Sequence, residues 1–188
     1  MALIRPAAPP GHVLQVLDLP AGGKILAHVQ VGFDQDFQSQ GWLVVTNRGL
    51  GICQSDRPAH LGHTDWVEIE RISLKRVAAD IPKRGAPAWL TIYLIDQSPA
   101  RRVLLPSSAK RVASLINERF EASIVTVDHL PVAEGRVRGA LRRLHNNKLE
   151  VQVIVPADLD RQAPEVQAAV LQLADKLSEA AGGLSGTW

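Results

Sequence analysis

The chain has 188 residues, a formal net charge of +2 and 46% hydrophobic residues. This length suits one domain, or one domain with an annex, and the apolar content is typical of a globular rather than a disordered protein. The small net charge argues against strong attraction of the whole molecule to nucleic acid, and the single Cys53 excludes an internal disulfide and fits a reducing compartment.

The first 22 residues are rich in Pro and Gly, which predicts a loose leader, with docking of residues 13–17 as a short edge piece as the alternative. This stretch lacks the apolar core of a signal peptide, and no apolar run elsewhere approaches the length needed to span a bilayer. We therefore expect a soluble, cytoplasmic protein.

Short apolar segments with strand-like alternation follow the leader. Residues 24–33 alternate with period two, and residues 42–46 and 50–53 flank Asn47-Arg48-Gly49. Because Asn and Gly tolerate a positive φ, this segment predicts a tight hairpin. Trp66, Ile69 and Ile72 recur at every third residue, which indicates a bulged or 3₁₀-like entry into the next strand.

A second predicted hairpin joins residues 89–95 to 101–105, and a helix follows it. Ser107 or Ser108 is expected to cap this helix, which runs over residues 108–120 with one apolar stripe. Many strands closed by one helix predict an α+β, mainly β fold. We expect a bent antiparallel sandwich or barrel with one capping helix.

The tail has its own pattern. Residues 136–142 and 149–155 alternate on either side of a turn, and a final helix begins near Pro164 and stops at Gly182-Gly183. We therefore expect a C-terminal β-β-α annex. The predicted organisation is a leader over residues 1–22, a main domain over 23–131, the annex packed on it over 132–183, and a flexible tail over 184–188.

Basic residues concentrate between Pro99 and Lys148, where ten Lys and Arg face four Asp and Glu, a balance of +6. Arginine forks suit phosphate or carboxylate groups, so this stretch supplies the candidate anion-binding or partner-binding residues. These are Arg136, Arg138, Arg142, Arg143, Arg101 and Arg102. In a strand, the first three share one face. The alternative is a solvated sheet face with cross-strand ion pairs.

Residues for catalysis or metal binding are sparse. His60, His63 and Asp65 are zinc-type ligands in one loop, but structural zinc usually takes four ligands, and a solvated polar loop explains the same residues. No Gly-x-Ser-x-Gly, phosphate-binding glycine loop or His-Glu-x-x-His occurs. We expect no catalytic residues, metal or cofactor.

Two segments carry a resemblance to a known family. Residues 41–50 contain the pattern Leu43-x-x-Thr46-x-x-x-Leu50, and Trp66-x-x-Ile69 follows it. Over roughly residues 24–122 the chain resembles bacterial pleckstrin-homology-like domains. The whole chain also resembles a group of uncharacterised actinobacterial proteins. The matching pieces are Leu105-Pro106, Arg119 with residues 122–125, and Arg142-Arg143.

The first resemblance implies a seven-stranded bent sandwich with a capping helix that binds lipids, peptides or proteins. It implies no catalytic residue. Lipid-binding members place Lys or Arg in the first hairpin loop, whereas this loop holds Asp34, Gln35 and Asp36. We therefore expect a non-catalytic binding or adaptor module with a protein partner. The alternative is peripheral binding to anionic membrane lipid or nucleic acid through the Arg-rich residues 99–148.

Overall fold

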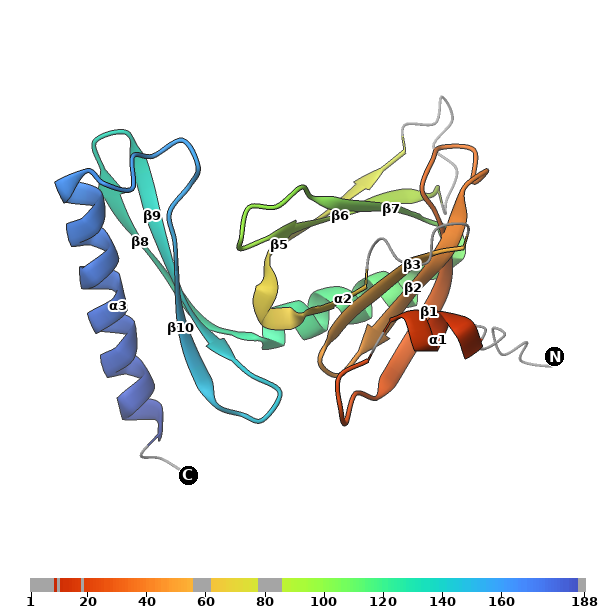
Figure 1. Ribbon diagram of the computed structural model, residues 1–188, viewed down its shortest axis with the longest axis horizontal. Helices are drawn as coiled ribbons and strands as arrows, with labels where there is room; N and C mark the ends of the chain where they lie inside the picture. Colours follow the sequence, from red (N-terminus) through yellow and green to blue (C-terminus); the bar gives the residue numbers. More distant parts are fainter. Residues whose placement is uncertain (1–8, 10, 18, 56–61, 78–85, 186–188) are drawn as a thin grey trace. The chain divides into compact units, whose positions relative to one another are not determined.

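The structure is a computed structural model that describes residues 9, 11–17, 19–55, 62–77 and 86–185 (Figure 1). The chain divides into two compact units, Met1–Arg119 and Phe120–Trp188. Both are built mainly from antiparallel strands, so the expected α+β, mainly β class is confirmed. Among the described residues, no helix combines the length and apolarity needed to cross a bilayer.

The first unit is a seven-stranded sheet with the strand order β4-β3-β2-β1-β7-β6-β5. Its elements, in chain order, are α1 (Gly11–Val16), β1 (Ile25–Gly32), β2 (Gln40–Thr46), β3 (Gly49–Gln54), β4 (His63–Asp65), the 3₁₀ turn η2 (Trp66–Glu68), β5 (Ile69–Arg76), β6 (Ala88–Leu94), β7 (Arg101–Leu105), the 3₁₀ turn η3 (Ser107–Ala109) and α2 (Lys110–Ala122).

The sheet of the first unit is strongly bent. β4 and β5 are its two outermost strands, yet η2 joins them through only three residues. Among the described residues they form no ladder with each other, so the sheet curls without closing into a barrel. The capping helix α2 adds the fully buried Ile116 to the core. Buried residues on the inner face of the sheet include Leu43, Val45, Ile52, Leu90, Ile92 and Val103.

The hairpin predicted around Asn47-Arg48-Gly49 is confirmed as β2 and β3, but the predicted reason for it is wrong. Neither Asn47 nor Gly49 has a positive φ. Gly49 pairs with Asp65 of β4, and a Cβ built on Gly49 overlaps the carbonyl oxygen of Thr64. Glycine is therefore required there by close approach of the β4 backbone. The 3₁₀ entry at Trp66 and the β6–β7 hairpin are also confirmed.

The predicted loose leader contains a short helix. Val13 of α1 and Leu17, which follows the helix, are buried against Val44 and Cys53 on the outer face of β2 and β3. Burial raises the pKa of the Cys53 thiol, so this side chain is a small core residue rather than a reactive thiolate.

The predicted serine cap of α2 is also corrected. Ser107 and Ser108 lie in η3, whose N-cap is Pro106 and which has no side-chain cap hydrogen bond. Proline in an extended conformation (φ −66°, ψ 158°) starts the turn instead, since its fixed φ suits the entry to a helix.

The second unit is a three-stranded sheet covered by one helix. It contains β8 (Ile124–Val132), β9 (Gly135–Arg143), β10 (Leu149–Ile154) and α3 (Pro164–Ser185), with the strand order β10-β9-β8. The β9–β10 hairpin and the start of α3 at Pro164 are as predicted. The predicted start of the annex at residue 132 is wrong, because β8 pairs with β9 along its whole length. α3 also continues past Gly182 to Ser185.

α3 packs on all three strands through one apolar face. Val166, Ala169 and Leu173 of α3 form a buried cluster with Val137 of β9 and with Leu159. A Cβ on Gly139 would lie only 2.6 Å from Cδ1 of Leu177, so the missing side chain lets the helix approach the centre of the sheet.

Candidate functional site

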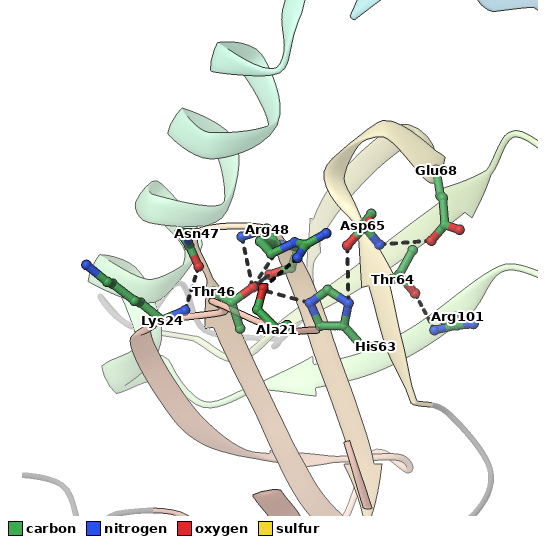
Figure 2. Close-up of polar contacts among 11 residues, drawn as sticks. Ala21, Lys24, Thr46, Asn47, Arg48, His63, Thr64, Asp65, Glu68 and Arg101 are labelled. Atoms are coloured by element: carbon green, nitrogen blue, oxygen red, sulfur yellow. Dashed lines mark hydrogen bonds and ion pairs between the residues drawn. The ribbon is translucent and has the colours of Figure 1, made fainter. Parts of the chain in front are cut away.

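Two groups of polar residues in the first unit deserve comparison as functional candidates. The first, which we call the enclosed polar cluster, is drawn in Figure 2 and consists of Thr46, His63, Thr64, Asp65, Glu68 and Arg101. These residues come from the end of β2, from β4, from η2 and from the start of β7.

Thr46 anchors the β2–β3 hairpin through its hydroxyl group. The side chain is fully buried, and Oγ1 accepts hydrogen bonds from the backbone N–H groups of Arg48 (3.1 Å) and Gly49 (2.9 Å). Its single proton can be donated to the carbonyl oxygen of Gly49 at 3.0 Å or to Nε2 of His63 at 3.2 Å. A Ser or Thr hydroxyl that takes up backbone groups in this way stabilises a tight turn.

His63 lies between Thr46 and Asp65. Its Nδ1 is 3.4 Å from Oδ1 of Asp65, and its side chain is only 9% exposed. Burial lowers the pKa of His63, and the positive charges of Arg48 and Arg101 lower it further. The carboxylates of Asp65 and Glu68 raise it without overcoming the cost of burial. His63 is therefore neutral at pH 7.

A hydroxyl, an imidazole and a carboxylate in this order resemble the parts of a nucleophilic triad. The geometry argues against that role, because the Thr46 hydroxyl has no exposed surface and already holds two backbone N–H groups. A nucleophile must reach its substrate. The arrangement instead fixes β4 to the turn between β2 and β3.

Further polar contacts extend the cluster to η2 and β7. The guanidinium of Arg101 donates to the hydroxyl of Thr64, and the backbone N–H of Asp65 donates to Oε2 of Glu68 at 2.9 Å (Figure 2). The N–H of Trp66 donates to the carbonyl of Arg48 at 2.9 Å. The cluster thus links β4, η2 and the start of β7 to the β2–β3 hairpin.

The structure describes two of the three predicted metal ligands. His63 and Asp65 do contact each other, and His60 lies outside the described residues. Within the described ranges, no group of three or more His, Cys, Asp or Glu side chains is arranged to hold a metal ion.

The structure corrects the predicted arginine stripe of β9. Arg142 is fully buried, where its Nη1 donates to Oγ of Ser123 at 3.0 Å and its guanidinium lies 5.2 Å from the ring centre of Phe120. Arg138 is half-buried, Arg136 is exposed, and Arg143 is exposed on the opposite face of the strand. The four arginines therefore form no continuous exposed row, although the alternation predicted for Arg136, Arg138 and Arg142 is correct.

Arg101 and Arg102 are neighbours on β7 and point to opposite faces. Arg101 belongs to the enclosed polar cluster, whereas Arg102 is exposed and lies 4.0 Å from the ring centre of Trp89. On β5, the guanidinium of Arg71 lies 4.0 Å from the ring centre of Tyr93. These distances are typical of a cation–π contact.

The strand register places these cations on one surface. Arg71 pairs with Tyr93, Lys75 with Trp89, and Arg102 with Thr91. Paired residues of an antiparallel sheet share a face, and Leu90 and Ile92 are buried on the other side. We call the exposed residues Arg71, Lys75 and Arg102 the cationic face. Among the described residues, no carboxylate forms an ion pair with any of them.

The basic stretch of residues 99–148 includes Arg102 but neither Arg71 nor Lys75. The signal was present, because Arg71, Ser73 and Lys75 alternate with Ile72 and Leu74. The register that sets them beside Tyr93 and Trp89 was not readable from the sequence.

No model of a protein family matches the chain, and no curated protein matches it either.

Proposed function

We propose that this chain is a non-catalytic binding module and that it holds a protein partner on its cationic face. One observation carries the proposal: Arg71 and Lys75 of β5 and Arg102 of β7 are exposed on one face of the sheet and have no ion-pair partner among the described residues. Cations that the fold does not neutralise are available to an acidic partner.

The stacking of two arginines on rings supports this reading. The contact with Tyr93 restricts the orientation of the Arg71 guanidinium, and the contact with Trp89 restricts that of Arg102. Since less side-chain freedom is lost when such a group binds, a preorganised fork binds a carboxylate at a smaller entropic cost.

The seven antiparallel strands followed by one capping helix agree with the expected pleckstrin-homology-like scaffold. We keep that family as a proposal, and with it the idea that the scaffold presents surfaces rather than a reaction centre. The enclosed polar cluster supports a non-catalytic role, because its hydroxyl is buried and already bonded.

Affinity capture tests the proposal. The full chain is immobilised and exposed to nuclease-treated lysate, in parallel with the variant Arg71→Gln/Lys75→Gln/Arg102→Gln. The matched control is Arg136→Gln/Arg143→Gln/Lys148→Gln, which removes the same charge from exposed positions of the second unit. We expect specific proteins to be retained by the chain and by the control, and lost on the variant.

If the proteins are lost on the control variant only, the binding site includes the exposed cations of the second unit, as predicted from the sequence. Retention of the same proteins by all three baits would contradict a role for the cationic face.

Anionic lipid or nucleic acid is the second candidate, and Arg102 belongs to both the cationic face and the basic stretch of residues 99–148. Binding to a polyanion falls steeply with salt because counterions are released. Sedimentation with phosphatidylserine vesicles and titration with single-stranded oligonucleotide, each at low and moderate salt, separate these partners from a protein.

A further inference from the structure

The cationic face lies beside the unpaired edge of β5, and this edge indicates which kind of protein segment could bind there. β5 is the last strand of the seven-stranded sheet and pairs only with β6 among the described residues. Over Arg71–Arg76 the ladder with β6 is regular, with one partner for each residue. An outermost strand presents a row of backbone N–H and C=O groups with which another strand can pair.

The two faces of this edge differ in chemistry. On the outer face lie Arg71, Ser73 and Lys75. On the inner face lie the half-buried Ile72 and the exposed Leu74, which is 37% exposed. A strand added here would place alternate side chains against cations and against apolar surface.

We propose, on the basis of the proposed function, that the β5 edge takes up an extended acidic segment whose residues alternate between acidic and apolar. The acidic side chains lie beside Arg71 and Lys75, and the apolar ones cover Ile72 and Leu74. The backbone of the segment pairs with that of β5.

Spacing supports an alternating rather than a clustered acidic sequence. Arg71 and Lys75 are four residues apart on one strand, which corresponds to about 13 Å. Carboxylates at every second residue of a paired strand match that spacing, whereas consecutive carboxylates would place half of their charge on the apolar side.

The other edges of the two sheets suit such a segment less well. β4 has only three residues, and β8 contains Pro131, which has no N–H to donate to a ladder. β10 contains no Lys or Arg, whereas β5 contains Arg71, Lys75 and Arg76.

Edge cations can have another purpose, because charged residues on outermost strands discourage unwanted pairing between molecules. The two roles differ in outcome. A protective edge rejects all strands, whereas a docking edge rejects neutral and basic strands and accepts acidic ones.

Fluorescence anisotropy with the full chain tests the proposal. The labelled probes are eight-residue peptides: alternating Glu and Val, a block peptide of four Glu followed by four Val, and alternating Lys and Val. We expect the alternating acidic peptide to bind at least about tenfold more tightly than the block peptide, and the Lys peptide not to bind.

Variants locate the site. Arg71→Gln and Lys75→Gln should each weaken binding of the alternating peptide about tenfold, while Arg136→Gln, an exposed cation of the second unit, should leave it unchanged. N-methylation of alternate peptide bonds, made in both registers, tests backbone pairing. One register should abolish binding, because it removes the N–H groups that face β5.

Several results would overturn the proposal. Equal binding of alternating and block peptides would show charge attraction without strand pairing. Rejection of every peptide would show a protective edge. Tighter binding of single-stranded oligonucleotide or of phosphatidylserine vesicles would show a different class of partner. Proteins captured through the cationic face despite failure of every peptide would refute the strand geometry and leave the proposed function standing.

Discussion

Arg101 and Arg102 are adjacent in the chain and belong to two different regions. Arg101 turns into the enclosed polar cluster and donates to Thr64, whereas Arg102 turns outward and stacks on Trp89. In the cluster, charged and polar groups are neutralised or hydrogen-bonded by other parts of the fold. On the cationic face, the fold supplies aromatic rings but no ion-paired carboxylate among the described residues.

This difference separates stability from binding. Substitutions in the enclosed polar cluster should change the free energy of unfolding and leave peptide binding intact. Substitutions on the cationic face should do the reverse. The following predictions test that separation.

The largest effect is expected at the closest backbone approach beside the cluster. Gly49→Ala should lower the free energy of unfolding by more than about 3 kcal/mol, because the added Cβ overlaps the backbone of Thr64 and must displace β4. Urea unfolding followed by tryptophan fluorescence measures the change. Gly11→Ala is the matched control, since a Cβ there meets no atom within 4 Å. Equal stability of the two variants would contradict the close approach.

Thr46→Val should cost about 2 kcal/mol of folding free energy, because the backbone N–H groups of Arg48 and Gly49 lose their acceptor in a buried site. Thr46→Ser keeps the hydroxyl and should cost less. Urea titration compares the two variants. If Thr46→Val folds but no longer binds the peptide, the claim that the enclosed polar cluster affects only stability is contradicted.

His63 should make the stability of the first unit sensitive to acid. Its pKa in the folded chain lies below the ordinary value of 6.5, so the unfolded chain binds the proton more readily. The contribution of neutral His63 is complete above pH 6.5 and is lost as the pH falls from there through the folded pKa. The free energy of unfolding at several values between pH 7.5 and pH 5 measures this slope.

The matched variant His63→Gln removes the titrating group. We expect a flatter dependence of stability on pH in this variant. An unchanged slope would assign the acid sensitivity to other groups.

The smallest change in stability is expected on the cationic face. Arg102→Gln should alter the free energy of unfolding by less than about 1 kcal/mol, the range of an exposed cation–π contact. Arg101→Gln, one residue away, should cost more, because it leaves the cluster without its link to β7. Acrylamide quenching should increase only in Arg102→Gln, as Trp89 loses its cover. A larger stability loss for Arg102→Gln would reverse the roles of the two arginines.

The sequence predicted the elements with strong local signals. The β2–β3, β6–β7 and β9–β10 hairpins follow from the alternation of apolar and polar residues. The Trp66 turn follows from apolar residues at every third position. These interactions are local, so a single sequence contains them.

The failures concern contacts between distant segments. Alternation placed Arg142 on the correct face but gave no sign of the burial beside Phe120 and Ser123. The pairing of β8 with β9 depends on the tertiary fold. The cationic face likewise depends on the register between β5, β6 and β7.

The three-residue η2 turn links the two outermost strands of the first sheet, and its capping contact from Asp65 N–H to Glu68 Oε2 holds that link short. Local unfolding of β4 should therefore disturb β5, and local unfolding of β5 should disturb β4. In hydrogen–deuterium exchange, the amides of β4 and β5 should lose protection together as one cooperative unit, even though five strands separate them in the order of the sheet. A ligand held along β5 would then slow exchange at His63–Asp65 as well.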